Sequence, residues 1–496
     1  MGPIAKLQVG ELEGRDRGGH LLFAGIPYAA PPTGDRRFAP PEPHPGWSGV
    51  RSARAFGKAA PQLPGTGLTR FPVEWDEDCL TLNVSTPALD DAARPVLVWI
   101  HGGAFVHGKG GIPWYDGGSF AERGNVVTVS INYRLGALGF AQLPLDVPEF
   151  AETGRLGLLD QLCALRWVQE HIATFGGDPS RVTVAGESAG AMSIGNLLGM
   201  PEARGLFRAA ILQSGAARHH LTEPLGAEVG RIFLDQLQAD SAAALRNAPV
   251  EAILEAQGRT QEQVVKHPEA ARAGIGSLAY QPSLGGALPR PPLETIADGA
   301  LREIPLLVGT NADETTLWGY QDFDDARLAR LAANLFPDAE AALATYRASR
   351  PGASAGEIAT AMTTDQLFRI PALQLCETHT AAGGNAFLYL FSWKSRAFGG
   401  KLGATHALEI PFTFHNLERP GVSGFLGKGP TPTALADRMH ACWTAFVHGQ
   451  DPNCDALDGE WPSFDPSRVP TQEFGDEVAL RLDPNGDERR LWDGLR

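Results

Sequence analysis

The sequence predicts an α/β fold with a mostly parallel central sheet flanked by helices, and two observations carry this prediction. Continuous apolar runs of strand length stand at residues 96–100 and 126–131, as in strands that are covered on both faces. A third β-branched run begins at Val182, and before it residues 158–172 carry apolar side chains at helical spacing. This alternation of strands and helices favours parallel strands joined by right-handed crossovers.

The remaining elements extend the same pattern along the chain. Further strands are expected at residues 7–9, 21–23, 209–212, 306–308 and 387–391. Residues 242–263 and 324–348 are predicted to be helical, and helical insertions at roughly residues 216–300 and 320–380 are expected to form a cap over the sheet. Because no repeat and no polar linker divides the chain, a single domain over residues 1–496 is expected.

Composition and charge narrow the range of functions. The 496 residues are 43% hydrophobic and 20% charged, which is ordinary for a globular enzyme. The formal net charge of -15 argues against nucleic acid or an anionic membrane as the main partner. Residues 1–8 lack the apolar segment of a secretion signal, and no apolar stretch reaches about 18 residues. A cytoplasmic protein without a membrane span is therefore expected.

The cysteines and histidines do not suggest a metal site. The five cysteines are spread along the chain without a C-x-x-C pair, at Cys79, Cys163, Cys376, Cys442 and Cys454. This odd and scattered set fits reduced thiols better than disulfides or zinc ligands. No H-E-x-x-H motif occurs, and the adjacent His219 and His220 cannot both face one ion from a regular element. Neither a metal nor a cofactor is expected.

Residues 182–191 are predicted to form a strand, a tight turn and the start of a helix, with Ser188 at the centre. The Gly-Glu-Ser-Ala-Gly core fits the G-x-S-x-G nucleophile elbow, in which glycines allow backbones to approach closely. A serine on such a turn stands clear of the sheet, between a base and an acyl carbon. The amide of Ala189 at the helix start would face the oxygen on which negative charge develops.

A second match to G-x-S-x-G, at residues 352–356 with Ser354 at its centre, provides an internal comparison. Arg350 and Pro351 precede it in place of an apolar β-branched run, so no strand delivers Ser354 to the edge of a sheet. This copy is predicted to be a loop, and Ser188 is the candidate nucleophile. The simpler interpretation of Ser188, a small residue that packs a tight turn, is outweighed by the partners that follow it in the chain.

A serine nucleophile needs a histidine base that an acid orients, and α/β hydrolases place the three in the order serine, acid, histidine. After the strand predicted at residues 306–308, a loop offers both Asp313 and Glu314, and the residues alone do not choose between them. Among the downstream histidines, only His406 lies in a loop shortly after an apolar strand. His440 and His448 fall on a predicted helix, where packing or exposure accounts for them.

Residues 101–105, His-Gly-Gly-Ala-Phe, directly follow the strand predicted at residues 96–100. Small residues there let backbone amides approach a carbonyl oxygen, as an oxyanion hole requires. Residues 103–109 also come close to a phosphate-binding loop. Because Gly110 stands where that loop needs a serine or threonine for magnesium, nucleotide binding is the weaker alternative.

These segments together resemble the type B carboxylesterase family of the α/β-hydrolase superfamily, in particular its bacterial para-nitrobenzyl esterase-like members. Besides the elbow, the resemblance rests on residues 23–28, 77–84, 157–178, 365–368, 406–412 and 461–462. It therefore spans most of the chain. The resemblance implies an α/β-hydrolase fold with helical cap insertions.

The resemblance also implies a catalytic triad. It makes Ser188 the nucleophile and His406 the base, and it selects Glu314 rather than Asp313 as the acid. The implied activity is that of a serine carboxylesterase, which hydrolyses small-molecule esters through an acyl-enzyme and needs no cofactor. A catalytically silent binding or adhesion member of the same fold is the alternative, and the presence of all three triad residues favours the enzyme.

The resemblance further assigns the oxyanion hole to the amides of Gly103, Ala104 and Ala189. It gives Glu187 and Ser214 supporting electrostatic and hydrogen-bonding positions around the triad. Family members with Gly-Gly-Ala in this loop often hydrolyse esters of bulky, even tertiary, alcohols. Broad activity on small or bulky uncharged esters, tertiary alcohol esters included, is therefore expected.

Overall fold

The protein is described by a computed structural model over residues 2–65, 73–266 and 278–495. Its residues group into two compact units. Unit 1 comprises Met1–Ile112, Gly117–Ala209 and Arg218–Thr295, and unit 2 comprises Pro113–Asp116, Ala210–Ala217 and Ile296–Arg496. This grouping leaves the expectation of a single domain over residues 1–496 untested. The stretch at 267–277, within the insertion expected at 216–300, lies outside the described residues.

The main strands of unit 1 follow one another in the order β9-β7-β8-β6-β4-β3. Their bounds are β3 Arg15–Asp16, β4 Leu21–Pro27, β6 Thr81–Thr86, β7 Arg94–Ile100, β8 Val127–Ile131 and β9 Gly177–Glu187. β7 pairs in parallel with both β8 and β9, whereas β8, β6, β4 and β3 pair antiparallel. Every residue of β7 and β8 is buried, which confirms the strands predicted from continuous apolar runs.

A small additional sheet in unit 1 corrects one prediction. It is formed by β1 Ile4–Leu7, β2 Gly10–Glu13 and β5 Val50–Ser52. The strand predicted at residues 7–9 is wrong, because Gln8 and Val9 form the turn between β1 and β2. The antiparallel pairing of Leu7 with Gly10 requires the chain to reverse there.

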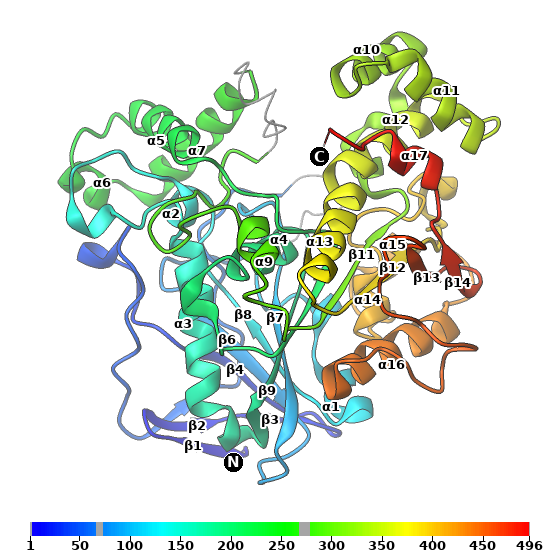
Figure 1. The fold of residues 1–496 in the computed structure, drawn as a ribbon. Coiled ribbons are helices and arrows are strands. Elements are labelled where there is room, and N and C mark those ends of the chain that lie inside the picture. Colours follow the sequence, from blue (N-terminus) through cyan, green and yellow to red (C-terminus); the bar gives the residue numbers. More distant parts are fainter. Residues whose placement is uncertain (1, 66–72, 267–277, 496) are drawn as a thin grey trace. The chain divides into compact units, whose positions relative to one another are not determined.

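Along the chain, the helices of unit 1 come between and after these strands (Figure 1). They are α1 Gly118–Gly124, α2 Gly136–Phe140, α3 Leu156–His171, α4 Ala189–Leu197, α5 Glu223–Leu237, α6 Ala242–Asn247 and α7 Val250–Val265, and α9 Pro292–Ala297 begins in this unit. The helix predicted over residues 158–172 is confirmed, and α4 packs against β9 and β7. The helix predicted at 242–263 is instead two helices, because Pro249 cannot continue α6.

The strands of unit 2 follow one another in the order β14-β13-β12-β11-β10. Their bounds are β10 Ala209–Gln213, β11 Leu306–Asn311, β12 Ala386–Phe391, β13 Pro470–Phe474 and β14 Val478–Leu482. β10, β11, β12 and β13 pair in parallel, and β14 turns back antiparallel to β13. The three strands predicted in this region are confirmed. Because β10 and β11 are parallel neighbours, the residues that follow them emerge at the same edge.

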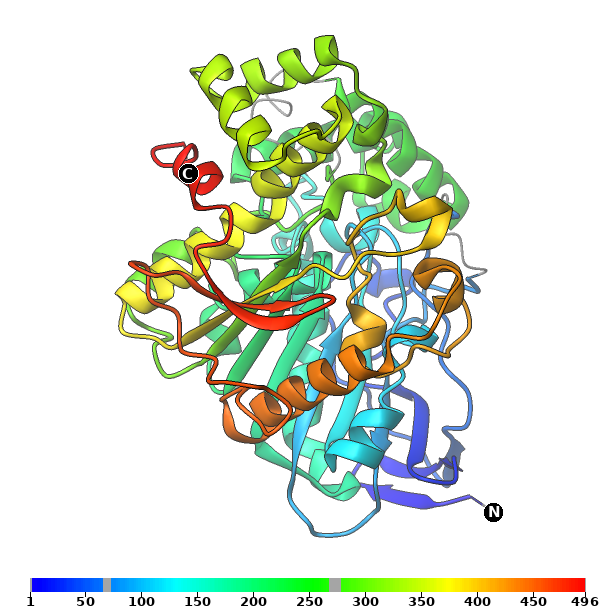
Figure 2. The same cartoon turned by 90° about the vertical axis from the view of Figure 1, so that its right-hand side faces the viewer.

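The helices of unit 2 are α10 Asp325–Leu335, α11 Ala339–Ser349, α12 Ala355–Thr364, α13 Ile370–Ala381, α14 Ile410–Thr413, α15 Val422–Leu426, α16 Thr433–Gly449 and α17 Gly486–Arg490. α13 packs on β11 and β12, and Figure 2 shows α16 in orange and the β13–β14 hairpin in red. The helix predicted at 324–348 is interrupted at Pro337, and the Asp338 side chain caps the new helix α11 by accepting the Ala341 N–H (3.0 Å).

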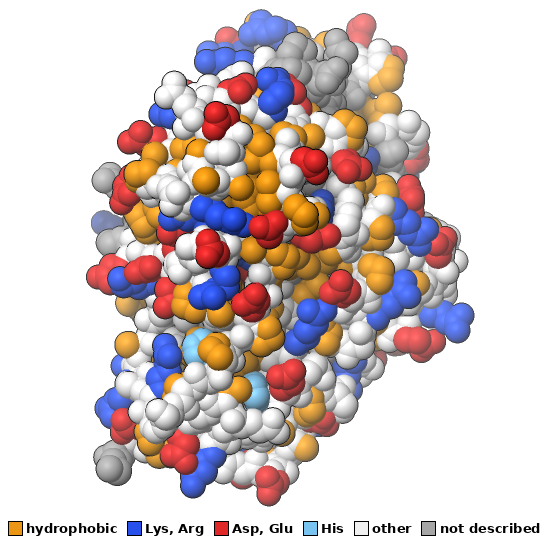
Figure 3. All heavy atoms as spheres, turned by 90° about the vertical axis from the view of Figure 1, so that its left-hand side faces the viewer, with side chains coloured by type: hydrophobic (Ala, Val, Ile, Leu, Met, Phe, Trp, Pro, Cys, Tyr) orange, Lys and Arg blue, Asp and Glu red, His pale blue; other side chains and the backbone are white. Residues whose placement is uncertain are grey.

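Charged side chains of both signs are interspersed over the described part of the face in Figure 3. In the stretches 2–65, 73–266 and 278–495, no helix is long and apolar enough to cross a bilayer.

Candidate active site

Ser188 occupies the turn that joins β9 to α4. Its φ of 53° and ψ of -125° lie where residues other than glycine are rarely found, so the turn holds the serine in a strained conformation. Helix α4 begins at the next residue, and the Met192 N–H donates to the Ser188 carbonyl oxygen (2.8 Å). The predicted arrangement of strand, turn and helix is therefore present.

Two glycines allow this turn to pack. A Cβ added at Gly190 would lie 2.0 Å from the carbonyl oxygen of Ile100, and one added at Gly186 would lie 2.7 Å from the carbonyl carbon of Gly190. Neither separation is sterically allowed, so β7, β9 and α4 approach this closely only with glycine at both positions. The glycines of the G-x-S-x-G pattern are thus required by the packing around Ser188.

The loop after β7 lies against the elbow within unit 1. A Cβ added at Gly102 would come within 2.7 Å of the Glu187 carbonyl oxygen and 2.9 Å of the Ser188 Cβ. Only glycine fits there, so the loop backbone sits directly beside the serine. The Glu187 side chain is buried and borders Gly102 as well, which places its carboxylate next to both the loop and the elbow.

The backbone of this loop adopts left-handed conformations after Gly102. Gly103 has a φ of 118° and Ala104 a φ of 54°, and these left-handed conformations turn the peptide planes of the loop. Within residues 2–65, 73–266 and 278–495, no protein acceptor is recorded for the N–H of Gly103, Ala104 or Ala189. The three amides predicted for an oxyanion hole lie in unit 1 with Ser188, and their role stays a prediction.

The histidine at the start of the loop is a structural residue. Burial lowers the pKa of His101 to about 4, so its ring is neutral at physiological pH. The ring stacks on Tyr133 with centroids 4.5 Å apart, and the Tyr133 hydroxyl donates to the His101 carbonyl oxygen (2.7 Å). His101 thus supports the loop rather than acting as a base.

Glu314 and His406 meet within unit 2. His406 Nδ1 lies 2.6 Å from Glu314 Oε2, and the His406 N–H donates to the Glu314 carbonyl oxygen (3.2 Å). The other carboxylate oxygen, Oε1, accepts the Asn311 N–H (2.8 Å) at the end of β11. Glu314 is fully buried. A carboxylate that accepts the Nδ1–H proton leaves Nε2 of the imidazole with a lone pair, which is the arrangement of a general base.

The alternatives to these two residues have other partners. Asp313 Oδ2 accepts the Ala404 N–H (2.9 Å), so its carboxylate is committed to the loop backbone before His406. His440 lies on α16, as predicted, with Nδ1 2.8 Å from the Thr413 carbonyl oxygen. Ser354 is the N-cap of α12, where its Oγ accepts the Glu357 N–H (3.3 Å). Among the described residues, no cluster of side chains fits a metal ion.

A second buried carboxylate, Glu409, lies beside Glu314 and was not anticipated from the sequence. Its Oε2 accepts from Asn311 Nδ2 (2.6 Å), and its Oε1 accepts from Gln213 Nε2 (3.0 Å). Asn311 therefore joins the two carboxylates, through its side chain to Glu409 and through its N–H to Glu314. Burial, and then the charge of Glu314, raise the pKa of Glu409 to about 7. A lone acid in the apolar run at residues 407–412 was the available signal.

Ser214 follows β10 at the same edge of unit 2. It is fully buried with a φ of 51°, and its N–H donates to the Gly309 carbonyl oxygen (2.8 Å). No partner for its hydroxyl is found among the described residues. Its predicted supporting role stays a prediction.

Replacement of Glu409 by glutamine should flatten the pH dependence of stability. In the folded protein the pKa of Glu409 is raised from 4.5 to about 7, so the folded state binds this proton more tightly than the unfolded chain. The wild type should therefore lose stability as pH rises between these values, by up to about 3 kcal/mol, and stay level above them. Glutamine does not titrate, so the variant should lack this decline. Melting temperatures across the interval measure it.

The control for this change is Glu418→Gln, because Glu418 is exposed on the same stretch of chain. That variant should keep the decline of the wild type. If the stability of Glu409→Gln fell as steeply with pH as that of the wild type, Glu409 would not be the titrating group.

Two aromatic rings surround His406 in unit 2. Trp318 and Phe368 stack with centroids 5.9 Å apart and an interplanar angle of 10°. Their centroids lie 5.3 Å and 4.9 Å from the imidazole of His406. Phe368 is buried, whereas Trp318 is 50% exposed. Phe105, in the loop after β7, is packed in the core against Phe140, and Phe398, on the segment before His406, is exposed.

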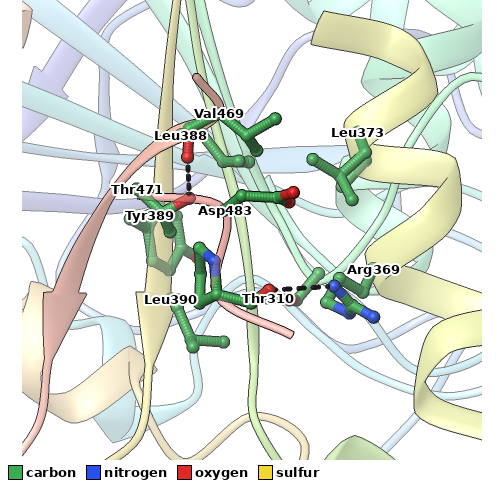
Figure 4. A pocket seen from close by; sticks show the side chains of 11 residues that line it. Thr310, Arg369, Leu373, Leu388, Tyr389, Leu390, Val469, Thr471 and Asp483 are labelled. Carbon is green, nitrogen blue, oxygen red and sulfur yellow. Dashed lines mark hydrogen bonds between the residues drawn. The ribbon is translucent and has the colours of Figure 1, made fainter. Parts of the chain in front are cut away.

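A small cavity in unit 2 lies between α13 and strands β11, β12 and β13 (Figure 4). Its volume of about 20 Å³ accommodates about one water molecule. Arg369 forms part of its wall and donates through Nη1 to the Pro484 carbonyl oxygen (3.3 Å). The cavity is too small for an ester and belongs to the contact between α13 and the C-terminal segment.

Sequence comparison with known proteins identifies one family and relatives that match along nearly the whole chain. A family model described as the carboxylesterase family matches residues 2–492. The chain is 37% identical to a para-nitrobenzyl esterase of Bacillus subtilis (strain 168), over 98% of each chain. It is 38% identical to a phenmedipham hydrolase of Pseudarthrobacter oxydans, over 97% of each.

Solved structures agree with the sequence comparison. A Geobacillus stearothermophilus carboxylesterase superposes with a TM-score of 0.87 at 37% identity, covering 99% of each chain. A thermophilic PNB esterase gives a TM-score of 0.88 at 34% identity, covering 99% of this chain and all of the other. The α/β-hydrolase fold and the resemblance predicted from sequence are both confirmed.

Proposed function

The chain belongs to the carboxylesterase family and is a carboxylic-ester hydrolase, and from this premise we propose that Ser188, Glu314 and His406 form its catalytic triad. The 2.6 Å contact between His406 Nδ1 and Glu314 Oε2 is the observation that supports the proposal most strongly. The strained turn at Ser188 supports the choice of nucleophile.

In the proposed mechanism, His406 Nε2 removes the Oγ proton of Ser188 while Oγ attacks the carbonyl carbon of the ester. The oxyanion accepts hydrogen bonds from the amides of Gly103, Ala104 and Ala189. His406 then protonates the departing alcohol, and an acyl-enzyme remains on Ser188. A water molecule, deprotonated by His406, attacks this ester, and the carboxylic acid leaves as the serine regains its proton.

Glu187 and Ser214 are proposed to support this machinery without reacting. Glu187 is buried where its carboxylate borders Gly102, so this side chain packs against the oxyanion loop. We propose that the ionised carboxylate favours the imidazolium form that His406 takes during the reaction. Ser214 supplies a buried hydroxyl at the edge of unit 2 from which Glu314 also emerges.

The proposed substrates are small or bulky uncharged esters, including those with an aromatic group. The Trp318 and Phe368 rings beside His406 offer an apolar surface next to the base. One relative is named for the para-nitrobenzyl group, which is aromatic. Aromatic pairs contribute about 0.5–1.5 kcal/mol beyond the area that they bury.

Trp318→Ala should lower kcat/KM for 1-naphthyl acetate by about 2- to 12-fold, which corresponds to the energy of one aromatic contact. The value for ethyl acetate should change little, because that ester has no ring to stack. Phe398→Ala is the matched control, since Phe398 is an exposed aromatic on the chain segment before His406. Equal losses for the two esters, or equal effects of the two variants, would show that Trp318 does not recognise the aryl group.

We include tertiary alcohol esters among the proposed substrates because the loop has the sequence Gly102-Gly103-Ala104. Turnover of tert-butyl acetate, followed by acid release at constant pH, is the direct assay. Hydrolysis of 4-nitrophenyl acetate without any turnover of tert-butyl acetate would restrict the enzyme to less hindered alcohols.

We further propose that the protein is cytoplasmic and does not bind nucleic acid. Both rest on sequence features, namely the scattered cysteines and the net charge of -15. Cell fractionation of the native host with an antibody to this chain tests the location.

A further inference from the structure

Two cysteines of unit 2 lie in contact, although their spacing of 12 residues matches no cysteine motif. Cys442 is on α16, and Cys454 is in the segment that follows this helix. Their sulfur atoms are 3.7 Å apart, although all five cysteines are free thiols in the structure. A disulfide bond is about 2.03–2.05 Å long, so the two sulfurs need to approach by less than about 2 Å to bond.

The backbone around Cys454 is fixed by several contacts. The Asn453 side chain accepts the Trp461 N–H (2.7 Å) and donates to the Trp461 carbonyl oxygen (2.9 Å), which closes the segment into a loop. Arg438, one helical turn before Cys442, binds Asp458 of this loop through Nη1 and Oδ2 (2.7 Å). The two thiols are therefore held together by interactions that do not involve sulfur.

The two thiols differ in exposure and in acidity. Cys442 is fully buried, whereas Cys454 is partly exposed. A hydrogen bond with the Cys442 thiol, together with the N–H groups of Ala456 and Leu457, lowers the pKa of Cys454 to about 6, and partial burial and the nearby Asp455 oppose this change. The same hydrogen bond and burial raise the pKa of Cys442, which Arg438 opposes. An accessible thiolate next to a buried thiol is the usual arrangement of a peroxide-sensitive pair.

We propose that Cys442 and Cys454 form a reversible disulfide when a hydroperoxide reacts with this protein. The Cys454 thiolate attacks the terminal peroxide oxygen, the O–O bond breaks, and hydroxide leaves from hydrogen peroxide or an alkoxide from an organic hydroperoxide, which gives a sulfenic acid on Cys454. The Cys442 sulfur then attacks the Cys454 sulfur, the S–O bond breaks, and water is released. The two thiols lose two electrons, which reduce the peroxide, and a dithiol that supplies two electrons and two protons restores both thiols.

The disulfide would tether the loop after α16 to the helix. At present the Arg438–Asp458 ion pair and the Asn453–Trp461 contacts hold this loop. Asp458 and Arg438 also border the surface groove between α16 and the β13–β14 hairpin, so the bond would fix one wall of that groove. Ester hydrolysis takes no part in this chemistry. The formation of this disulfide is therefore independent of the proposed triad.

Mass spectrometry of the full chain tests the proposal. After brief treatment with hydrogen peroxide, alkylation and digestion should yield a linked pair of peptides containing Cys442 and Cys454, lighter than the separate peptides by two hydrogen atoms. Two of the five cysteines should lose reactivity, and dithiothreitol should restore them. Cys163→Ala should still form the link. Failure to find it, or a link that joins two molecules, would overturn the proposal.

A second variant distinguishes the order of events. In Cys442→Ser the sulfenic acid on Cys454 has no thiol to attack it, so dimedone should label Cys454 after peroxide treatment. In the wild type this label should be strongly reduced. The rate of Cys454 alkylation by iodoacetamide should rise with a midpoint near pH 6. Dimedone labelling of another cysteine in place of Cys454 would contradict the assignment of the attacking thiolate.

Discussion

Ser188→Ala should lower kcat for 4-nitrophenyl acetate by about 10⁶-fold, as the loss of a serine nucleophile does in other hydrolases. The hydroxyl is the only protein group in the proposed mechanism that forms a covalent bond to the acyl carbon. Substrate binding should change little, because the oxyanion donors and the aromatic rings remain. The measurement is single-turnover and steady-state hydrolysis with a highly purified variant, since traces of the wild-type enzyme would set the lowest activity that can be detected.

Ser354→Ala is the matched control for this variant, because Ser354 is the centre of the second G-x-S-x-G match. Its hydroxyl caps α12 and takes part in a capping box with Glu357. The control should therefore keep kcat and lose about 1 kcal/mol of stability. Comparable loss of kcat in both variants, or activity retained in Ser188→Ala, would contradict the assignment of the nucleophile.

Glu314→Gln should lower kcat by about 10⁴-fold with a small change in KM. Glu314 Oε1 accepts the Asn311 N–H and Oε2 faces His406 Nδ1. An amide in this place turns an N–H group toward one of these two donors. If it faces the imidazole, His406 must carry its proton on Nε2, and this tautomer cannot accept the proton of Ser188. Loss of the negative charge also removes the stabilisation of the imidazolium.

Asp313→Asn is the control for the acid, because Asp313 and Glu314 are the two candidates in the same turn. Asp313 accepts the Ala404 N–H, so its replacement should disturb the loop but leave kcat within about tenfold of the wild type. Steady-state kinetics of both variants decide the matter. A greater loss in Asp313→Asn than in Glu314→Gln would transfer the role of the acid to Asp313.

The elbow and the buried strands could be predicted from sequence because local physics determines them. A β-branched run followed by small residues leaves few options for the backbone around Ser188, and the short contacts at Gly186 and Gly190 show why. The same local features distinguish Ser188 from Ser354, which lacks a preceding strand and caps a helix instead. Helix boundaries were harder, since Pro249 and Pro337 interrupt patterns whose apolar spacing continues beyond them.

The choice between Asp313 and Glu314 illustrates what residue types alone cannot decide. The two side chains are adjacent at the start of the 3₁₀ helix Glu314–Trp318, and the turn sends them to different partners. Glu409 was missed for a different reason. Its partners Gln213 and Asn311 are 196 and 98 residues away in sequence, so only the folded sheet brings these groups together. The contact between Cys442 and Cys454 likewise depends on a loop that no cysteine spacing motif describes.

Labelling with a fluorophosphonate, followed by peptide mapping and an assay of 4-nitrophenyl acetate hydrolysis, tests the central role of Ser188 most directly. The reagent reacts with an activated serine and forms a stable adduct. A single adduct on the peptide that contains Ser188, with loss of turnover in proportion to labelling, is the predicted result. Turnover with the adduct on another peptide would contradict the assignment of the nucleophile, and neither adduct nor turnover would mean that this elbow does not activate its serine.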